Sequence, residues 1–124
     1  MTHDAHTWEA AWWSAVAEPA ENSARVVRTL LGDRAGREWL QNDWKGVPRE
    51  LNAYGHVDWH HQWGRWRERA LSVDADRDLA RIERAGGSLI TPSDPRWPSQ
   101  LSCLGDNEPL GLWVLGTLPE SARS

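Results

Sequence analysis

The sequence predicts an α+β fold that is mainly α, with a small helical bundle over residues 1–85 and a strand–turn–helix–strand segment over residues 86–116. Two observations predict this organisation. Apolar residues recur at helical spacing through the first part, which is the pattern of helices that each bury one face. The second part contains two short β-prone runs on either side of three prolines, which interrupt both helices and central strands. Residues 117–124 have little to bury, so we expect a flexible tail.

The first helix is predicted from a stripe of four apolar residues at spacings of i, i+4, i+7 and i+8: Trp8, Trp12, Ala15 and Val16. Thr7 is a suitable N-cap, and Pro19 should stop the helix. Trp13 lies off the stripe, so we expect it to be partly exposed or covered by a neighbouring segment.

Five further helical segments follow. A second helix should begin at Asn22 or Ser23 and end at Gly32. Its buried residues should be Val26, Val27, Leu30 and Leu31. A third, short helix carries Ala35, Trp39 and Leu40, and a helical turn or two is expected over residues 49–54.

The next stripe, between residues 57 and 71, consists of Trp59, Trp63, Trp66 and Ala70. Gly64 within it weakens the helix by about 1 kcal/mol relative to alanine. Ser72 or Asp74 should cap the last helix, and Gly86 should end it in the left-handed conformation. The stripe of that helix is Ala75, Leu79 and Ile82.

The segment from residue 86 to residue 116 is predicted to begin with a strand over residues 88–91. Pro92, Pro95 and Pro98 follow, and Pro98 suits the first turn of a short helix that would carry Gln100, Leu101 and Leu104. Residues 110–115 form a nearly unbroken apolar run, typical of a strand covered on both faces in a parallel sheet. Two strands are too little sheet to be stable alone, so they either pack on the bundle or begin a larger domain.

The composition narrows the class of protein. The 124 residues carry a formal net charge of −4, so no overall positive charge favours nucleic acid. Ten tryptophans and no phenylalanine indicate that indole rings fill the core, and the single cysteine, Cys103, excludes an internal disulfide. No apolar run approaches the ~20 residues of a membrane span, and the N-terminus is unlike a secretory signal. We therefore expect a cytoplasmic protein with no membrane partner.

A set of spaced residues in the C-terminal third resembles the DNA-processing protein A family (DprA, also called Smf), in an actinobacterial version. The residues that carry this resemblance are Asp94, Trp97, Pro98, Leu101, Pro109, Leu110, Trp113 and Gly116. The resemblance implies an N-terminal SAM-like bundle, related in shape to helix-hairpin-helix domains, followed by the first strands of a truncated Rossmann-like sheet. It therefore implies that the chain is either an N-terminal fragment or a naturally truncated protein.

The function that the resemblance implies is non-enzymatic and needs no cofactor. Proteins of this family bind single-stranded DNA, protect incoming strands and help to load the RecA recombinase during natural transformation. Their main DNA pocket lies in the Rossmann-like part, beyond Ser124, so the resemblance assigns no DNA-contact residue here. The alternative is a helical protein-interaction module that does not bind DNA, which the lack of positive charge favours.

Histidines near residue 60 raise the hypothesis of a metal site. His56 and His60 are spaced i and i+4, so on one helix they would share a face. A zinc site needs three or four protein ligands, and no cysteine pair or distant histidine pair completes this one. A solvated polar face is therefore the favoured interpretation, and a small metalloprotein remains the alternative.

Arginines interleave with tryptophans in the same region. Arg65, Arg67 and Arg69 alternate with aromatic residues, a mixture that can stack bases and neutralise phosphates. The tryptophans share one helical face while the arginines point elsewhere, so core tryptophans with a solvated charged face are favoured. The turn over residues 31–36 lacks the Gly-hydrophobic-Gly core of a DNA-binding hairpin.

No catalytic residues are predicted. Cys103 has no base near it in the sequence, and Gly86 and Gly87 precede a strand instead of following one, the reverse of a dinucleotide-binding loop. We expect no enzyme. Trp97 should anchor the proline turn, and Trp113 should lie within the second strand.

Overall fold

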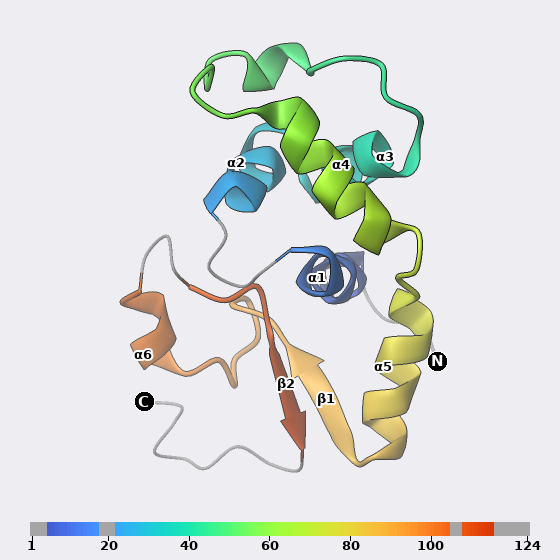
Figure 1. Cartoon of the computed structure of the whole chain (residues 1–124). Coiled ribbons are helices and arrows are strands. Elements are labelled where there is room, and N and C mark those ends of the chain that lie inside the picture. The colour runs from blue at the N-terminus through green and yellow to red at the C-terminus, as the bar shows by residue number, and fades with distance from the viewer. Residues whose placement is uncertain (1–4, 18–21, 105–107, 116–124) are drawn as a thin grey trace.

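The computed structural model describes residues 5–17, 22–104 and 108–115 (Figure 1). Its elements, in chain order, are α1 (Ala5–Val16), α2 (Asn22–Leu31), α3 (Asp33–Gln41), the 3-10 helix η1 (Arg49–Leu51), α4 (Trp59–Ala70), α5 (Ala75–Arg84), β1 (Gly87–Ile90), α6 (Ser99–Ser102) and β2 (Leu112–Leu115). The fold is therefore α+β and mainly α, as predicted. No helix in the described ranges has the length and apolar character needed to cross a bilayer. The predicted stop at Pro19, the signature residue Gly116 and the tail 117–124 lie outside the described residues.

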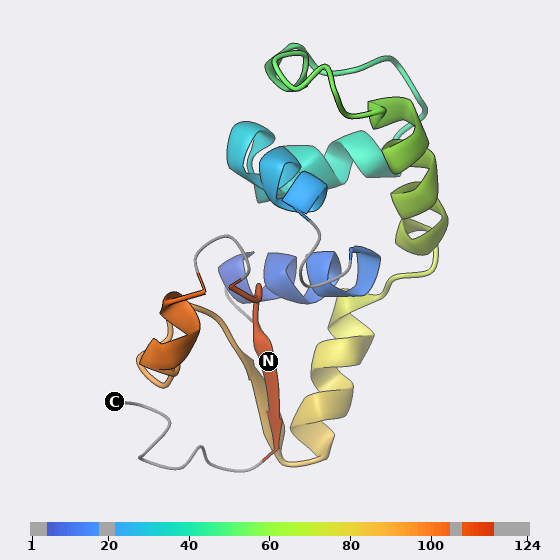
Figure 2. The same cartoon turned by 60° about the vertical axis from the view of Figure 1, so that its left-hand side comes forward.

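Helix α1 lies at the centre of the molecule. The helices α2, α3 and α4 lie on one side of it, and α5 with the two strands lies on the other (Figures 1 and 2). Because α1 has neighbours on several sides, both Trp12 and Trp13 are buried, and their rings meet edge to face with centroids 5.2 Å apart. Trp13, which lies off the predicted stripe, is thus covered by a neighbouring segment, the second of the two expected outcomes, whereas Ala15 of the predicted stripe is exposed.

The packing of α3 on α1 depends on a glycine. A Cβ added to Gly36 would lie 3.0 Å from the Trp13 ring and 3.0 Å from Val27, so only a very small residue fits. The indole Nε1 of Trp13 donates to the carbonyl of Asp33 at 3.1 Å, which ties α1 to the first turn of α3.

The burial of the N-terminal helices departs from the predictions in detail. Helix α1 begins at Ala5, so Thr7 lies inside the helix and is not its cap. In α2, which has the predicted bounds, Val27 is buried but Leu30 is exposed, because α2 packs mainly against α3 and η1 on one side. In α3, Leu40 is buried while Ala35 is exposed.

Helices α4 and α5 follow the predicted stripes closely. Trp59 and Trp66 of α4 are buried. Each helix is capped by an aspartate: Asp58 accepts a hydrogen bond from the backbone N–H of His61 at 3.1 Å, and Asp74 accepts one from Arg77 at 2.9 Å. Asp74 is one of the two caps that the sequence predicted.

The predicted stripe of α5 is also packed, since Ala75 and Leu79 are buried and Ile82 is half-buried. Gly86 has φ of 83°, the left-handed conformation expected after the helix end.

The two strands pair with each other in antiparallel order, with Gly87 opposite Leu115 and Ile90 opposite Leu112. A Cβ on Gly87 would overlap the carbonyl oxygen of Val114, so this position needs glycine. Leu89 of β1 belongs to the core of the bundle, and β1 packs on α1 and α5. The hairpin therefore packs back on the helices.

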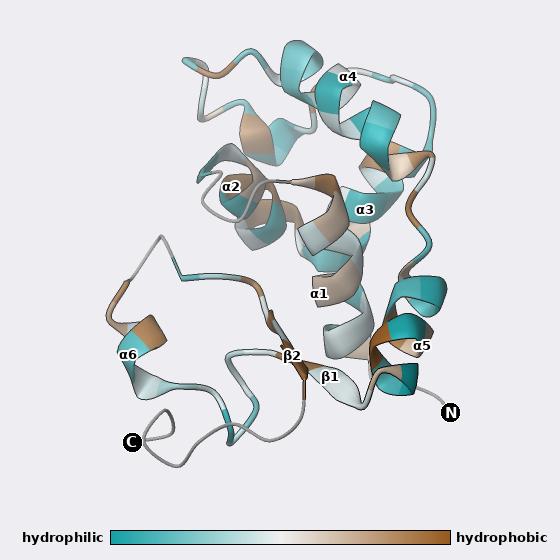
Figure 3. Cartoon of the chain, turned by 60° about the horizontal axis from the view of Figure 1, so that its bottom comes forward, coloured by the Kyte–Doolittle hydropathy of each residue, from teal (hydrophilic) through white to brown (hydrophobic). Residues whose placement is uncertain are grey.

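The expectation of a strand covered on both faces was wrong for β2 within the described residues. Trp113 and Leu115 are 42% and 67% exposed, although β2 is one of the most apolar segments of the chain (Figure 3). The helices cover β1 but reach only part of β2. Within the described residues, β1 packs on both α1 and α5, whereas β2 lies farther from α1 and packs mainly on α5.

Candidate functional site

The proline turn between the strands is built by the signature residues. Trp97 is only 6% exposed, and its indole Nε1 donates to Oε2 of Glu108 at 3.1 Å, which joins the two arms of the segment. Asp94 accepts hydrogen bonds from the backbone N–H, Nε and Nη2 of Arg96 at 2.8, 3.1 and 3.0 Å. The side-chain hydrogen bond from Arg96 lowers the pKa of Asp94, and the same bond raises the pKa of Arg96. The turn is thus held by one buried ring and one ion pair.

The other signature residues lie around this turn. Pro98 is the N-cap of α6, so the helix begins one residue later than predicted, at Ser99. Leu101, Pro109 and Leu110 are half-buried, and Leu104 is exposed. Trp113 lies within β2, as predicted.

An apolar groove of about 490 Å³ runs between α1, α5 and β2. Trp113 and Leu115 lie on the sheet face that carries Leu89, because directly opposed residues of an antiparallel pair share a face. Ile82 and Ala15 from the helices line the other side of the groove. Exposed apolar side chains gathered on an outer strand are typical of a surface that another segment or protein covers.

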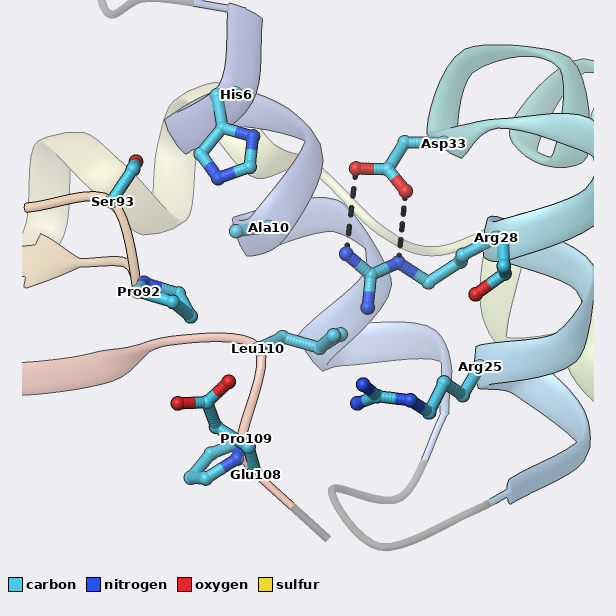
Figure 4. A pocket seen from close by; sticks show the side chains of 11 residues that line it. His6, Ala10, Arg25, Arg28, Asp33, Pro92, Ser93, Glu108, Pro109 and Leu110 are labelled. Atoms are coloured by element: carbon cyan, nitrogen blue, oxygen red, sulfur yellow. Dashed lines mark hydrogen bonds and ion pairs between the residues drawn. The ribbon is translucent and has the colours of Figure 1, made fainter. Parts of the chain in front are cut away.

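A second cleft, of about 490 Å³, separates α1 and α2 from the ends of the proline segment (Figure 4). Arg25 and Arg28 reach toward it from α2, and Arg28 is held by Asp33 through two hydrogen bonds of 3.0 and 3.4 Å. Glu108 and His6 lie on the opposite wall. With two guanidinium groups and two carboxylates, the cleft is balanced in charge, unlike a pocket built for a polyanion.

The arginines that the sequence singled out contact other helices. Nη1 of Arg67 donates to the carbonyls of Leu40, at 2.7 Å, and Asn42, and so caps the C-terminal end of α3. Nη1 of Arg69 donates to the carbonyl of Val16 at the end of α1, at 3.0 Å. These bonds give Arg67 and Arg69 a role in holding the bundle together.

Arg65 differs from its two neighbours, since its Nη2 donates to Oε1 of Gln62 on the same helix, at 2.8 Å. Of the three arginines, it is the one that lines a hollow on the outer side of α4. The structure therefore separates the three candidates and does not align them in one strip.

The two histidines of the metal hypothesis do not share a helix face. His56 lies in the turn before α4, with its ring centroid 6.1 Å from that of Tyr54. His60 lies in the first turn of α4 and stacks on Trp44, with centroids 4.3 Å apart and an interplanar angle of 14°. Within the described ranges, no group of three or more histidine, cysteine, aspartate and glutamate side chains is placed to hold a metal ion.

The structure reveals an aromatic cluster that the sequence did not predict. The Trp44 ring lies 5.3 Å from Trp63 and 6.2 Å from Trp39, in addition to its stack with His60. Nε1 of Trp63 donates to the carbonyl of Trp39 at 2.9 Å, and Nε1 of Trp39 donates to the carbonyl of Gly46 at 3.3 Å. These bonds hold the loop of residues 42–48 against α3 and α4. In the sequence, the one sign of this cluster was Trp44, a tryptophan within a loop of mainly polar residues.

The fold and these surfaces define a small helical domain with a docked β-hairpin, whose distinctive features are an apolar groove, a charge-balanced cleft and an aromatic cluster. The chain matches no family model, and comparisons with curated proteins and with solved structures found no significant similarity. Its function is therefore argued from its own residues.

Proposed function

We propose that this chain is the N-terminal module of a DprA-like protein, a cytoplasmic and non-enzymatic factor that binds single-stranded DNA. In this proposal the whole protein protects incoming strands and helps to load RecA during natural transformation. The observation that carries the proposal is that the signature residues come together in one unit: Asp94 and Trp97 organise the turn, and Trp113 lies in the strand that the turn leads to.

The groove beside β2 supports a larger sheet. A two-stranded sheet is marginal by itself, and β2 here has β1 on one edge only among the described residues. A further strand or helix packed beside β2 would cover Trp113 and Leu115, and burying a leucine side chain contributes roughly 1.5–3 kcal/mol. Trp113, one of the residues that carry the resemblance, thus faces the place where a larger domain would pack.

The charge distribution indicates which part of such a protein would hold the DNA backbone. The module has a net charge of −4, Arg67 and Arg69 are bonded to helix ends, and the cleft of Figure 4 is neutral. Phosphate contacts require a concentration of positive charge. The main DNA site of the whole protein is therefore assigned to the part that follows this module.

The test compares this chain with a longer one that includes the residues encoded after Ser124. Labelled oligo-dT is titrated with each protein and followed by fluorescence anisotropy at low and high salt. We expect the longer protein to bind the oligonucleotide at micromolar concentration or tighter, with an affinity that falls as salt rises. A longer protein that folds but binds the oligonucleotide no more tightly than this chain does would refute the proposal.

A paired substitution tests the packing part of the proposal. Leu115→Lys should leave the stability of this chain nearly unchanged, because the side chain is 67% exposed, but should destabilise the longer protein. Leu71→Lys, at a side chain that is 71% exposed and outside the groove, is the matched control. Equal tolerance of Leu115→Lys in both proteins would show that no domain covers the groove.

The apolar groove also favours a second candidate, a module that binds another protein and not DNA. In that case the longer protein would bind oligo-dT no more tightly than this chain and would tolerate Leu115→Lys in its own fold, whereas the substitution would abolish capture of the protein partner.

A further inference from the structure

The outer side of α4 carries an exposed aromatic stack. The imidazole of His60 covers one face of the Trp44 ring at 4.3 Å, and His60 itself is exposed. The rings of Trp63 and Trp39 also contact Trp44, and the indole bond from Trp39 to the Gly46 carbonyl holds the loop that carries Trp44 against α3. The outer face of the imidazole is therefore a rigid, flat platform that a further planar ring can extend.

Gly64 lies one helical turn after His60, on the same face of α4. Glycine in a helix interior is less favourable than alanine, yet a Cβ added here would find nothing within 4 Å. Packing inside the described chain thus gives no reason for glycine at this position. A glycine without such a reason is typical of a place where a ligand approaches the backbone closely.

A hollow of about 500 Å³ joins these two features. Its lining combines His60, His61, Gly64 and Arg65 with the carboxylates of Asp58 and Glu68. The hollow has a platform at one end, a bare stretch of helix in the middle, and donors on His61 and Arg65 at its side.

We propose that this surface binds single-stranded nucleic acid, with an unpaired base stacked on His60, the backbone passing over Gly64 and a phosphate within reach of Arg65. Base–aromatic stacking tolerates any sequence, because every base has a flat face. The binding site lies in the helical module and is separate from the DNA site assigned above to the following part, so the inference does not depend on the proposed function.

The geometry argues against other occupants. The lining is mainly polar and charged, so an apolar helix of a partner protein would bury unpaired groups here. The Trp44 ring contacts the rings of Trp63 and Trp39, at 5.3 and 6.2 Å between centroids, which leaves no space between these pairs for an ammonium group. A duplex offers no unstacked base to the platform.

The acidic groups of the hollow limit its expected affinity for nucleic acid. Asp58 and Glu68 repel phosphate at both ends of the hollow, so binding depends on stacking and is weak. We expect dissociation constants in the range of tens to hundreds of micromolar at low salt, near the non-specific range.

The experiment uses this chain and a fluorescein-labelled oligo-dT of about 15 nucleotides at low salt. Dissociation constants are measured by anisotropy for the wild type and three variants. His60→Ala should weaken binding about tenfold, the size expected from the loss of one stacked base, whereas His60→Phe keeps a flat ring and should preserve it. Glu68→Gln should tighten binding severalfold, because it removes one negative charge.

Gly64→Leu separates binding from folding. The substitution fills the hollow and replaces glycine by a strong helix former, so it should weaken binding at least tenfold while the melting temperature stays equal or rises. His56→Ala, which removes an exposed histidine outside the helix, is the matched control and should leave binding unchanged.

Several results would overturn the proposal. The first is a failure of the wild-type protein to bind the oligonucleotide at low salt. The second is an equal affinity for a duplex, and the third is an unchanged affinity in both His60→Ala and Gly64→Leu. Self-association of the chain that Gly64→Leu abolishes would assign the surface to a second copy instead. None of these results affects the longer protein's DNA site, so this proposal and the proposed function fail independently.

Discussion

Replacing Trp97 by alanine tests how the proline turn is held. The ring is 6% exposed, and removing a buried tryptophan typically costs about 3–5 kcal/mol. The loss also removes the hydrogen bond to Glu108, a contribution of about 1 kcal/mol that belongs to the same total. Trp97 lies outside the main core cluster, which contains Trp12, Trp66 and Leu89. The cost should therefore fall on the segment between the strands and not on the bundle.

The expected result has two parts. In Trp97→Ala, amide hydrogen exchange between residues 91 and 104 should become fast, because the local free energy of opening falls by several kcal/mol. The melting temperature of the helices, followed by circular dichroism, should fall by less than about 5 °C, because little of the loss should reach the bundle. A loss of 1 kcal/mol shifts the melting temperature of a domain of this size by roughly 2–8 °C. The exchange rates and melting temperature of Trp97→Phe should lie between those of the wild type and those of Trp97→Ala. Leu104→Ala, at an exposed position of the same segment, is the control.

Two outcomes would refute this reasoning. Unchanged exchange in Trp97→Ala would mean that the indole does not hold the turn, and the structural role of the signature would be lost. A fall of more than 10 °C in the melting temperature of the helices would mean that the turn and the bundle unfold as one unit.

Three further predictions concern other parts of the fold. Gly87→Ala places a methyl group on the Val114 carbonyl oxygen and should separate the strands; slow amide exchange retained in residues 112–115 would contradict this. Glu9→Gln weakens a largely buried ion pair with Arg37, whose closest N–O distance is 2.8 Å, and should lower the free energy of unfolding in urea by about 2–4 kcal/mol; a change below 0.5 kcal/mol would show that the pair contributes little. The lowered pKa of Asp94 stabilises the folded turn above about pH 4, and this contribution, below about 1 kcal/mol, disappears as pH falls through the folded pKa. Wild type and Asp94→Asn should therefore differ in exchange of the turn at pH 6, and this difference should shrink as the pH falls below about 4; a difference that does not shrink in acid would exclude the ion pair as its cause.

The helices that pack on one side were predictable from sequence, and the central helix was not. A stripe at helical spacing assumes one buried face, which holds for α4 and α5, and the cap Asp74 and the end glycine Gly86 of α5 were also recognisable. Helix α1 is surrounded by other elements, so Trp13 is as buried as Trp12, and no stripe separates them. The spacing of apolar residues predicts which residues of a helix are exposed only when one side of the helix faces water.

The strands show a different limit. An unbroken apolar run predicted that β2 is a strand, and it is, but the run carries no information about which segment covers it or in which direction its partner runs. The antiparallel pairing follows from the turn at Trp97, which reverses the chain within about twenty residues.

The aromatic stack could not have been predicted from local sequence. Trp44 lies in an irregular loop, Trp39 ends one helix and His60 begins another, so no spacing rule connects them. The same holds for Arg67 and Arg69, whose partners are carbonyls exposed at the ends of distant helices. Contacts to helix ends depend on the tertiary arrangement, which places a cation near a free carbonyl.

The ten tryptophans do more than fill the volume that phenylalanine would fill. In the described residues, indole N–H groups donate to acceptors in other segments in six cases: Trp8 to Asp76, Trp13 to Asp33, Trp39 to Gly46, Trp59 to Leu51 and Tyr54, Trp63 to Trp39, and Trp97 to Glu108. Most of these bonds join a helix to the backbone of the loop or helix end beside it. No side-chain nitrogen or oxygen buried in the described part lacks a hydrogen bond. A phenylalanine would supply the apolar area but would lose these bonds between segments, each a contribution of about 1 kcal/mol. The composition of the chain therefore follows from an architecture of short helices with many ends close to the core.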